Sequence, residues 1–198
     1  MKKLALVMIS LLFIAPAALA DNWGASVKLG AGENDPALLK EAHSYSGGEL
    51  TKSYGIFGLE ALYEWNLNDE TTKVGASVGL DVYGENELKS GGNKATESTY
   101  ALPITVYYKK DNGIKAWSYY GGAGISFLHS ELEVTGEGEE SKWKTFPHIT
   151  IGGEYRFTKV FALGLEGKYN FSAKVKREGL VLSDRSGLSG SIVGRFYF

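Results

Sequence analysis

The sequence offers three histidines as candidate general bases, and one of them lies beside a nucleophile and an acid. His129 is followed directly by Ser130 and Glu131, which are the residue types of a hydrolytic serine relay. Consecutive side chains of a strand point to opposite faces, so an extended segment cannot bring these three together. His43 falls in a predicted loop, and His148 is expected to be a satisfied polar residue that faces inward. We therefore predict no catalytic residue and no enzymatic activity.

Metal and cofactor chemistry has no better support in the sequence. The chain contains no cysteine, which removes thiolate ligands, thiolate nucleophiles and disulfides. We find neither a metal-ligand spacing nor a glycine-rich loop of the kind that binds phosphates or dinucleotides. No metal and no cofactor are expected.

A second set of chemically active residues consists of ten charged side chains that share one face of alternating segments. They are Lys28, Glu60, Glu64, Lys73, Asp81, Glu154, Arg156, Glu166, Lys168 and Arg195. Enclosed together, opposite charges satisfy one another, whereas an unpaired charge is costly. We predict a structural network that brings Lys28 to Glu60, and the arginines of the sixth and last segments to glutamates of the sixth and seventh.

Eight segments with period-two alternation of apolar and polar residues must position these charges. They cover approximately residues 23–30, 57–67, 73–82, 99–108, 117–127, 148–157, 161–171 and 189–198. Segments of about 10 to 14 residues are long enough for tilted strands to cross the hydrocarbon core of a bilayer. The pattern predicts an all-β protein.

The connections between these segments alternate in length. Short links near 68–69, 112–113 and 158–159 alternate with long polar ones near 31–53, 84–98, 130–144 and 173–186. Outer-membrane barrels have short periplasmic turns and longer extracellular loops. The fold prediction is therefore an eight-stranded antiparallel up-and-down transmembrane β-barrel, a meander with both termini on the periplasmic side.

A soluble barrel or sandwich, such as a lipocalin-like binder, would alternate in the same way but with its apolar face inward. The distribution of charge favours the membrane barrel, because the apolar face is nearly uncharged and would be a poor surface for water. Aromatic residues also gather at segment ends, as in interfacial girdles. They are Trp23, Tyr54, Tyr63, Trp65, Tyr83, Tyr100, Tyr108, Trp117, Tyr119 and Tyr169.

The first twenty residues have the pattern of an export signal. Lys2 and Lys3 precede an apolar run over 4–15, and 18–20 form a small-x-small cleavage site. The run is short for a membrane helix, which needs about 20 residues. We predict a cleaved signal peptide over 1–20 and a barrel domain over 21–198. Loss of the two leader lysines from the 21 Lys and Arg leaves a net charge of −4 against 23 Asp and Glu, which argues against nucleic acid as a partner.

Four stretches, 101–104, 119–124, 152–157 and 194–198, carry a family resemblance. With them the chain resembles the small outer-membrane barrels of the OmpA transmembrane region, OmpX and the opacity-type porin family. The resemblance implies a bacterial outer-membrane location, contact with lipid and lipopolysaccharide, and a monomer. It also implies that Phe196 and Phe198 form the signal read by the barrel-assembly machinery. Pro103 removes a ladder donor, so a local bulge is expected there.

The expected function is a non-enzymatic scaffold or surface-interaction role through four extracellular loops. The third loop is acidic (Glu131, Glu133, Glu137, Glu139 and Glu140) and the fourth is basic (Lys174, Lys176, Arg177 and Arg185). These charges are either solvated or form a surface for a ligand. Two alternatives remain open at this point, a narrow channel for ions or small hydrophobic solutes and an enzyme that modifies lipid A.

Overall fold

The structure is a computed structural model that describes residues 22–32, 36–67, 71–112, 116–134, 138–177 and 180–198. The expected signal peptide over 1–20 and the expected turn residues 68–69 and 113 lie outside the described residues. Glu137 also lies outside them, as do the side chains of Glu139, Glu140 and Arg177.

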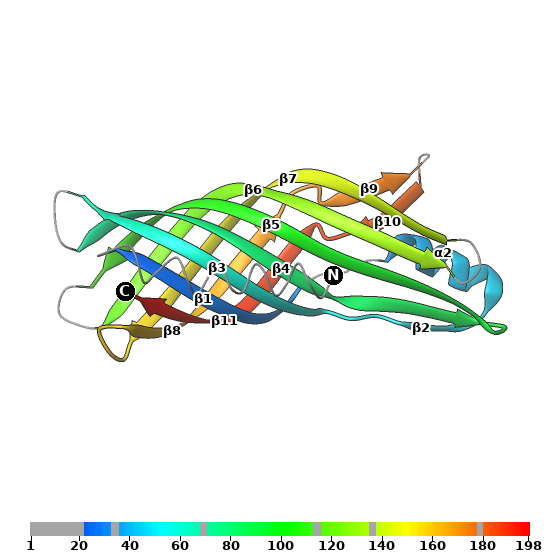
Figure 1. The fold of residues 1–198 in the computed structure, drawn as a ribbon, viewed down its shortest axis with the longest axis horizontal. Coiled ribbons are helices and arrows are strands. Elements are labelled where there is room, and N and C mark those ends of the chain that lie inside the picture. Colours follow the sequence, from blue (N-terminus) through cyan, green and yellow to red (C-terminus); the bar gives the residue numbers. More distant parts are fainter. Residues whose placement is uncertain (1–21, 33–35, 68–70, 113–115, 135–137, 178–179) are drawn as a thin grey trace.

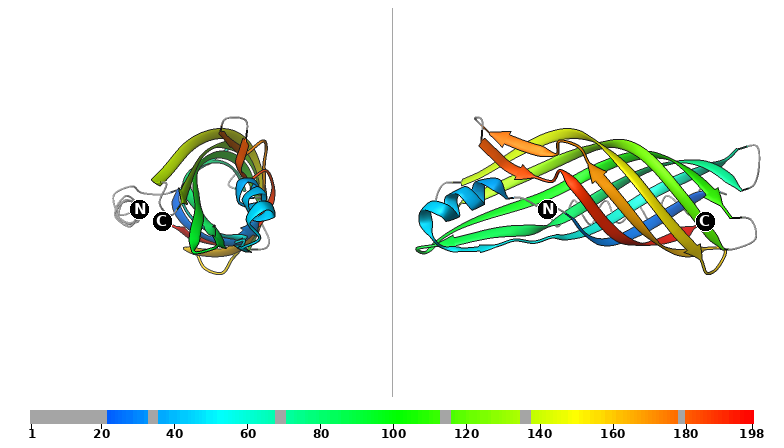
Figure 2. Two further views of the ribbon diagram at one scale, coloured as in Figure 1. Left: turned by 90° about the vertical axis from the view of Figure 1, so that its right-hand side faces the viewer. Right: turned by 180° about the vertical axis from the view of Figure 1, so that it is seen from behind.

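Eight antiparallel strands close into a barrel (Figures 1 and 2). Their bounds are β1 Trp23–Gly32, β3 Gly55–Asn66, β4 Thr72–Ser90, β5 Asn93–Asp111, β6 Trp117–Val134, β7 Gly138–Arg156, β8 Phe161–Asn170 and β11 Gly187–Tyr197. Each strand pairs with its neighbours in this order, and β11 pairs with β1 to close the sheet. The predicted eight-stranded up-and-down barrel is confirmed.

The barrel presents its apolar residues outward and its charged residues inward. Leu29, Ile151 and Leu165 are each more than half exposed on the outer face, while Lys28 and Glu166 are buried within. A lone outward charge in the spanning region would face hydrocarbon, and the sequence has none at the outward positions between Val74 and Val82. This arrangement is the one expected of a barrel in a membrane.

Aromatic rings gather on the outer face near both ends of the spanning strands. Trp23, Tyr63 and Trp65 make edge contacts near the short turns, with centroids 5.0 and 4.6 Å apart. Toward the loops, Tyr169 packs against Phe171. The sequence predicts Tyr83 in this girdle because it stands at a segment end, and this prediction is wrong. Its side chain is 6% exposed and lies inside the barrel, because Tyr83 stands two residues after the inward Asp81 on the same strand.

The strands on one side of the barrel are longer than the alternation predicted. The expected loops 84–98 and 130–144 are mostly strand, since β4 reaches Ser90, β5 starts at Asn93 and β6 runs to Val134. Gly91 and Gly92 form the β4–β5 turn with φ of 57° and 88°, angles that suit glycine. Polar residues on both faces hide the period of two, but backbone pairing continues, with Ala95 opposite Val134.

The extra length produces a wall beyond the end of the barrel. We call the loop-side parts of β4 to β7, together with the short β2 (Glu49–Thr51) that pairs with β4, the extracellular wall. β8 pairs with β7 only from His148 onward, and β11 begins at Gly187, so the opposite side is shorter. The right-hand view in Figure 2 shows that β4 to β7 extend farther toward the loop end than β8 and β11.

Pro103 causes no bulge. The β4–β5 register is the same on both sides of it, with Val78 opposite Ile104 and Asp81 opposite Ala101. The shift in this strand pair lies between Tyr83 and Asn86 instead. Proline at 103 thus interrupts the ladder without adding a residue to it.

The remaining elements lie at the loop end. α2 (Ala37–Ser46) occupies the first long connection and ends at Gly47, which is left-handed with φ 72°. β9 (Lys174–Arg177) and β10 (Leu180–Asp184) form a separate two-stranded sheet, and α2 packs against β10. Among the described residues, no helix has the length and apolar content needed to cross a membrane.

The outward face generates a stability prediction. Val78 is 53% exposed at the centre of the apolar outward run of β4. Val78→Arg should lower the free energy of unfolding in phospholipid vesicles by about 2–4 kcal/mol, the cost of an arginine near the bilayer midplane. Asn93→Arg, at the exposed β4–β5 turn, is the control and should change it by less than about 0.5 kcal/mol. Equal effects in denaturant titrations would mean that Val78 does not face lipid.

Candidate functional site

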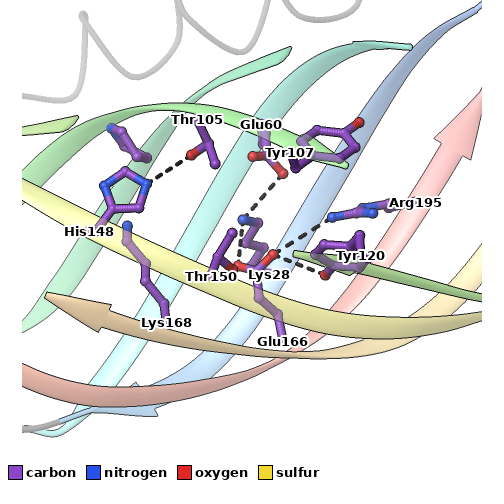
Figure 3. Close-up of a pocket in the computed structure, with 11 residues that line it drawn as sticks. Lys28, Glu60, Thr105, Tyr107, Tyr120, His148, Thr150, Glu166, Lys168 and Arg195 are labelled. Atoms are coloured by element: carbon purple, nitrogen blue, oxygen red, sulfur yellow. Dashed lines mark hydrogen bonds and ion pairs between the residues drawn. The ribbon is translucent and has the colours of Figure 1, made fainter. Parts of the chain in front are cut away.

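The centre of the lumen is a three-way ion pair built from strands far apart in sequence. Lys28 Nζ on β1 lies 3.2 Å from Glu60 Oε2 on β3 and 2.8 Å from Glu166 Oε1 on β8 (Figure 3). Gly58 stands beside the lysine stem, and a Cβ there would come within 2.7 Å of Asp81 Oδ1. The lysine is placed between two carboxylates because β1 pairs with β3 on one side and reaches β8 across β11 on the other.

Arg195 joins this centre to a second carboxylate. Its Nη1 donates to Glu154 Oε2 at 3.0 Å, and its Nη2 lies 3.7 Å from Glu166 Oε2. The guanidinium also stacks 4.1 Å from the ring centroid of Tyr120, whose hydroxyl donates to Glu166 at 3.0 Å. Arg195 is 3% exposed, so its charge depends on these carboxylates for compensation.

Toward the short turns, the network continues through a lysine that is not among the ten charges predicted from the sequence. Lys109 is fully buried, with Nζ 3.0 Å from Glu64 Oε1 and 2.6 Å from Glu154 Oε1. It also donates to the Tyr197 hydroxyl at 2.7 Å. Three consecutive charged residues, 109–111, are typical of a chain that approaches a turn. Lys109 nevertheless stands two residues after the inward Tyr107, so alternation along the strand predicts that it points inward. Lys73 completes this end, 3.3 Å from Glu64 Oε2.

Arg156 has a different environment from the other predicted charges. Its guanidinium lies 4.5 Å from the centroid of the Tyr197 ring. Its Nε and Nη2 have no hydrogen-bond partner within the described part of the protein. The carboxylates that the sequence offered as its partners lie with Arg195 instead.

Toward the loops, the lumen contains a second ion pair and a histidine. Lys168 Nζ lies 2.8 Å from Asp81 Oδ2. His148 is 1% exposed, with Nε2 2.9 Å from Thr105 Oγ1 and Nδ1 2.9 Å from Ser126 Oγ. Because hydroxyl groups occupy both ring nitrogens, neither nitrogen is available as a base toward a substrate.

The other histidines are not arranged for catalysis. His129 packs on the outer face between Tyr100 and Trp143, with ring centroids 4.7 Å away on each side. Ser130, the next residue, is buried and has the opposite parity. His43 lies in α2. His129 and Ser130 therefore do not form a pair of base and nucleophile.

Polar side chains crowd the centre of the lumen. The cavity at the centre, lined among others by Lys28, Glu60, Thr105, His148 and Arg195, has a volume of about 10 Å³. This is close to the space that a single water molecule needs. Charges of both signs, in direct contact, thus surround this cavity at the centre of the lumen.

The mouth at the loop end contains an apolar cluster. Tyr83, Leu128 and Phe146 of the barrel strands cluster with Ala173 and Val175, which come from the fourth long connection. Arg185, predicted in a basic exposed loop, is instead 2% exposed beside this cluster, 5.0 Å from the centroid of Tyr83. The polar residues beside Arg185 are typical of a surface loop, so the sequence predicts that it is exposed. Contacts with distant strands bury it instead.

Other loop charges remain at the surface. Lys174 pairs with Asp184 across the β9–β10 hairpin at 3.1 Å. On the extracellular wall, Glu87 lies between Lys89 and Lys94. Hydrogen bonds from these two ammonium groups hold the pKa of Glu87 below its ordinary value. The acidic Glu131 and Glu133 lie on β6 of the same wall.

Comparisons with known proteins agree with the geometry. Residues 4–190 match a family described as outer membrane protein beta-barrel domain. No curated protein matches the sequence.

Solved structures share the fold at low identity. Neisserial surface protein A is 16% identical with a TM-score of 0.57, covering 89% of this chain and 97% of that one. OprG of Pseudomonas aeruginosa is 10% identical with a TM-score of 0.52 (90% and 96%). Ail, the attachment invasion locus protein of Yersinia pestis, is 15% identical with a TM-score of 0.50 (90% and 99%).

The ion-pair network generates a second stability prediction. Arg195→Ala leaves Glu154 and Glu166 without their shared cation in a buried site. It should lower the free energy of unfolding by about 3–5 kcal/mol, as removal of one partner of a buried pair does. Lys174→Ala removes one partner of the more exposed pair with Asp184 and should cost at most about 1 kcal/mol. Denaturant titration in vesicles compares them, and a small effect at Arg195 would contradict a stabilising network.

Proposed function

This chain belongs to the family of outer membrane protein β-barrel domains, and on that premise we propose that it is a closed, non-enzymatic scaffold whose extracellular side carries its interactions. The outer membrane is the setting of the family. The specific role proposed is a membrane-integrity scaffold that also presents a surface to ligands outside the cell.

The observation that carries this proposal is the filled lumen. Ion pairs link β1, β3, β8 and β11 across its centre, and the cavity between them is about 10 Å³. An eight-stranded barrel has an interior just wide enough for side chains. This supports a structural role for the lumen charges over a narrow channel, since a conducting path would require several of these pairs to separate together.

The positions of the histidines support a non-enzymatic role. His148 has both ring nitrogens engaged by hydroxyl groups, and His129 and Ser130 have opposite parity on β6. A relay of nucleophile and base needs hydrogen-bond contact between the two side chains. The lipid A-modifying alternative therefore lacks a relay in the residues that suggested it.

The extracellular wall supports an interaction role. It raises a polar, hydrogen-bonded sheet beyond the shorter side of the barrel, and exposed side chains such as Tyr45, Lys89 and Lys94 lie at its end or on α2 nearby. Lipopolysaccharide and an extracellular ligand are the partners proposed for this side. Structured strands can present such side chains with less loss of conformational entropy than flexible loops.

Biogenesis features belong to the same proposal. Residues 1–20 would direct export, and Phe196 and Phe198 would be read by the barrel-assembly machinery before the barrel closes as a monomer. In support, both phenylalanines are about half exposed on the outer face. Phe198 N also donates to Trp23 O at 2.9 Å, which joins the last residue to the first strand.

Conductance tests the closed lumen. The purified protein in planar bilayers should show no discrete current steps, because ion pairs obstruct the lumen. The double variant Lys28→Ser, Arg195→Ser is the matched control, since the same barrel with its central cations removed should show small, brief openings. Its folding is checked by heat-modifiable gel mobility. Reproducible steps from the wild-type protein would overturn the scaffold proposal in favour of a channel.

Lipid A analysis tests the absence of enzymatic activity. Lipid A from cells that produce the wild-type protein, the His129→Ala variant or no protein should give the same mass spectrum. His129 is chosen because it lies beside Ser130 and Glu131 in the sequence. A mass change that requires the wild-type protein would refute the non-enzymatic proposal, and its loss in His129→Ala would identify the base.

A further inference from the structure

The β9–β10 hairpin stands apart from the barrel sheet. Its two strands pair only with each other, whereas the other strands form one continuous sheet. We call the described residues 173–177 and 180–186 the flap. The backbone bonds at its base are Phe171 N to Pro147 O and Arg185 N to Ala173 O, each 3.0 Å. The flap is therefore attached through its base and through side chains, without a ladder to the wall.

Both junctions of the flap have left-handed backbone geometry. Ser172, two residues after the end of β8, has φ of 52°, and Gly187 at the start of β11 has φ of 117°. A non-glycine residue in this region carries strain, which persists only where surrounding contacts hold it. The two junctions are thus positions where the chain turns sharply and where the held geometry depends on the flap's contacts.

The first of these contacts is an apolar seat on the inner face of the extracellular wall. Ala173 is fully buried and Val175 is 2% exposed, against Tyr83, Leu128 and Phe146. The seat is contributed by strands β4 to β7, and Ala173 and Val175 are the two small side chains that the described part of the flap places against it. Lys176, the neighbour of Val175, is exposed. One side chain of β9 thus anchors it in the mouth, and the next lies in solvent.

The second contact is a guanidinium beside a buried carboxylate. Arg185 Nη2 donates to Thr99 Oγ1 at 3.2 Å and lies 3.9 Å from Glu97 Oε1. Glu97 is 2% exposed, and its Oε2 accepts a hydrogen bond from Asn86 Nδ2 at 2.8 Å. At 3.9 Å this ion pair is at the long end of direct contact.

Several polar atoms of the flap region are buried without a protein partner. Arg185 Nε, Asn170 Oδ1 and the hydroxyl of Ser183 have no hydrogen-bond partner within the described part of the protein. Solvent would satisfy these groups if the flap lifted, and this gain offsets part of the apolar contact that is lost.

We propose that the mouth of the barrel is a binding site for an amphipathic cation, and that the flap is hinged at Ser172 and Gly187 and occupies this site with its own side chains. Val175 fills the apolar seat, and the Arg185 guanidinium neutralises Glu97. A ligand that replaces the flap must provide the same chemistry, a short aliphatic chain that carries a guanidinium or ammonium group. This assignment goes beyond the surface role proposed above and does not depend on it.

Thiol labelling measures whether the flap lifts. The chain has no cysteine, so Val175→Cys introduces a single thiol at the seat, and Lys176→Cys places the matched control in solvent. In full-length protein in vesicles, a maleimide should label Cys at 175 at least tenfold more slowly than Cys at 176. Adding Arg185→Gln or Gly187→Ala should accelerate labelling at 175 by tenfold or more and leave 176 unchanged, with heat-modifiable mobility retained.

The labelling experiment has two outcomes that overturn the proposal. If the thiol at 175 reacts as fast as the thiol at 176, the flap does not occupy the mouth. If it stays protected in both Arg185→Gln and Gly187→Ala while the barrel remains folded, the flap is a fixed part of the core and no hinge exists.

Ligand competition tests the site itself. n-Butylguanidinium should accelerate labelling at 175 with saturable dependence on concentration, because it holds the flap out of the mouth. Guanidinium and n-butanol at the same concentrations are controls that carry the charge or the chain alone. Glu97→Gln should abolish the saturable effect. Absence of acceleration, or acceleration that is equal with either control, would overturn the amphipathic-cation site.

Discussion

The confinement of charge in a narrow lumen is the constraint on which this structure depends. Eight strands leave an interior that side chains must fill, and a buried charge is tolerated only beside an opposite one. Lys28, Arg195 and Lys109 each contact two carboxylates, and the shared carboxylates Glu166 and Glu154 link them into one chain along the barrel axis. The strand register must hold these groups within hydrogen-bond distance. The register that closes the barrel is therefore also the one that pairs the charges.

This constraint also divides the molecule by function. The part of the barrel that crosses the membrane has ion pairs at the centre of its interior and an apolar outer face. The loop side differs because its wall is tall over β4 to β7 and short over β8, β11 and β1. An asymmetric rim gives adjacent elements, α2 and the β9–β10 hairpin, an inner surface to pack against. The recognition proposed for this protein therefore lies where the barrel stops being symmetric.

The apolar mouth illustrates how the two regions meet. Below it, Lys168 and Asp81 close the polar lumen, while Tyr83, Leu128 and Phe146 form an apolar layer directly above. An apolar layer needs a cover on the solvent side, and the fourth connection supplies it with Ala173 and Val175. Burial of Arg185 accompanies that cover, since the guanidinium can pair with Glu97 and lie over the ring of Tyr83 together.

By itself the sequence determined the barrel, the inward direction of the charges and the pairing of Lys28 with Glu60, because alternation and strand adjacency are local properties. It did not reveal Lys109, whose charged neighbours resembled a turn, or the length of β4 to β7, whose polar faces lack an apolar period. Only the tertiary structure decided that Lys28 also meets Glu166, 138 residues away, and that Arg185 is buried. Those contacts depend on the register at which the sheet closes and on how a connection folds back over it, and neither is recorded in the pattern of any single segment.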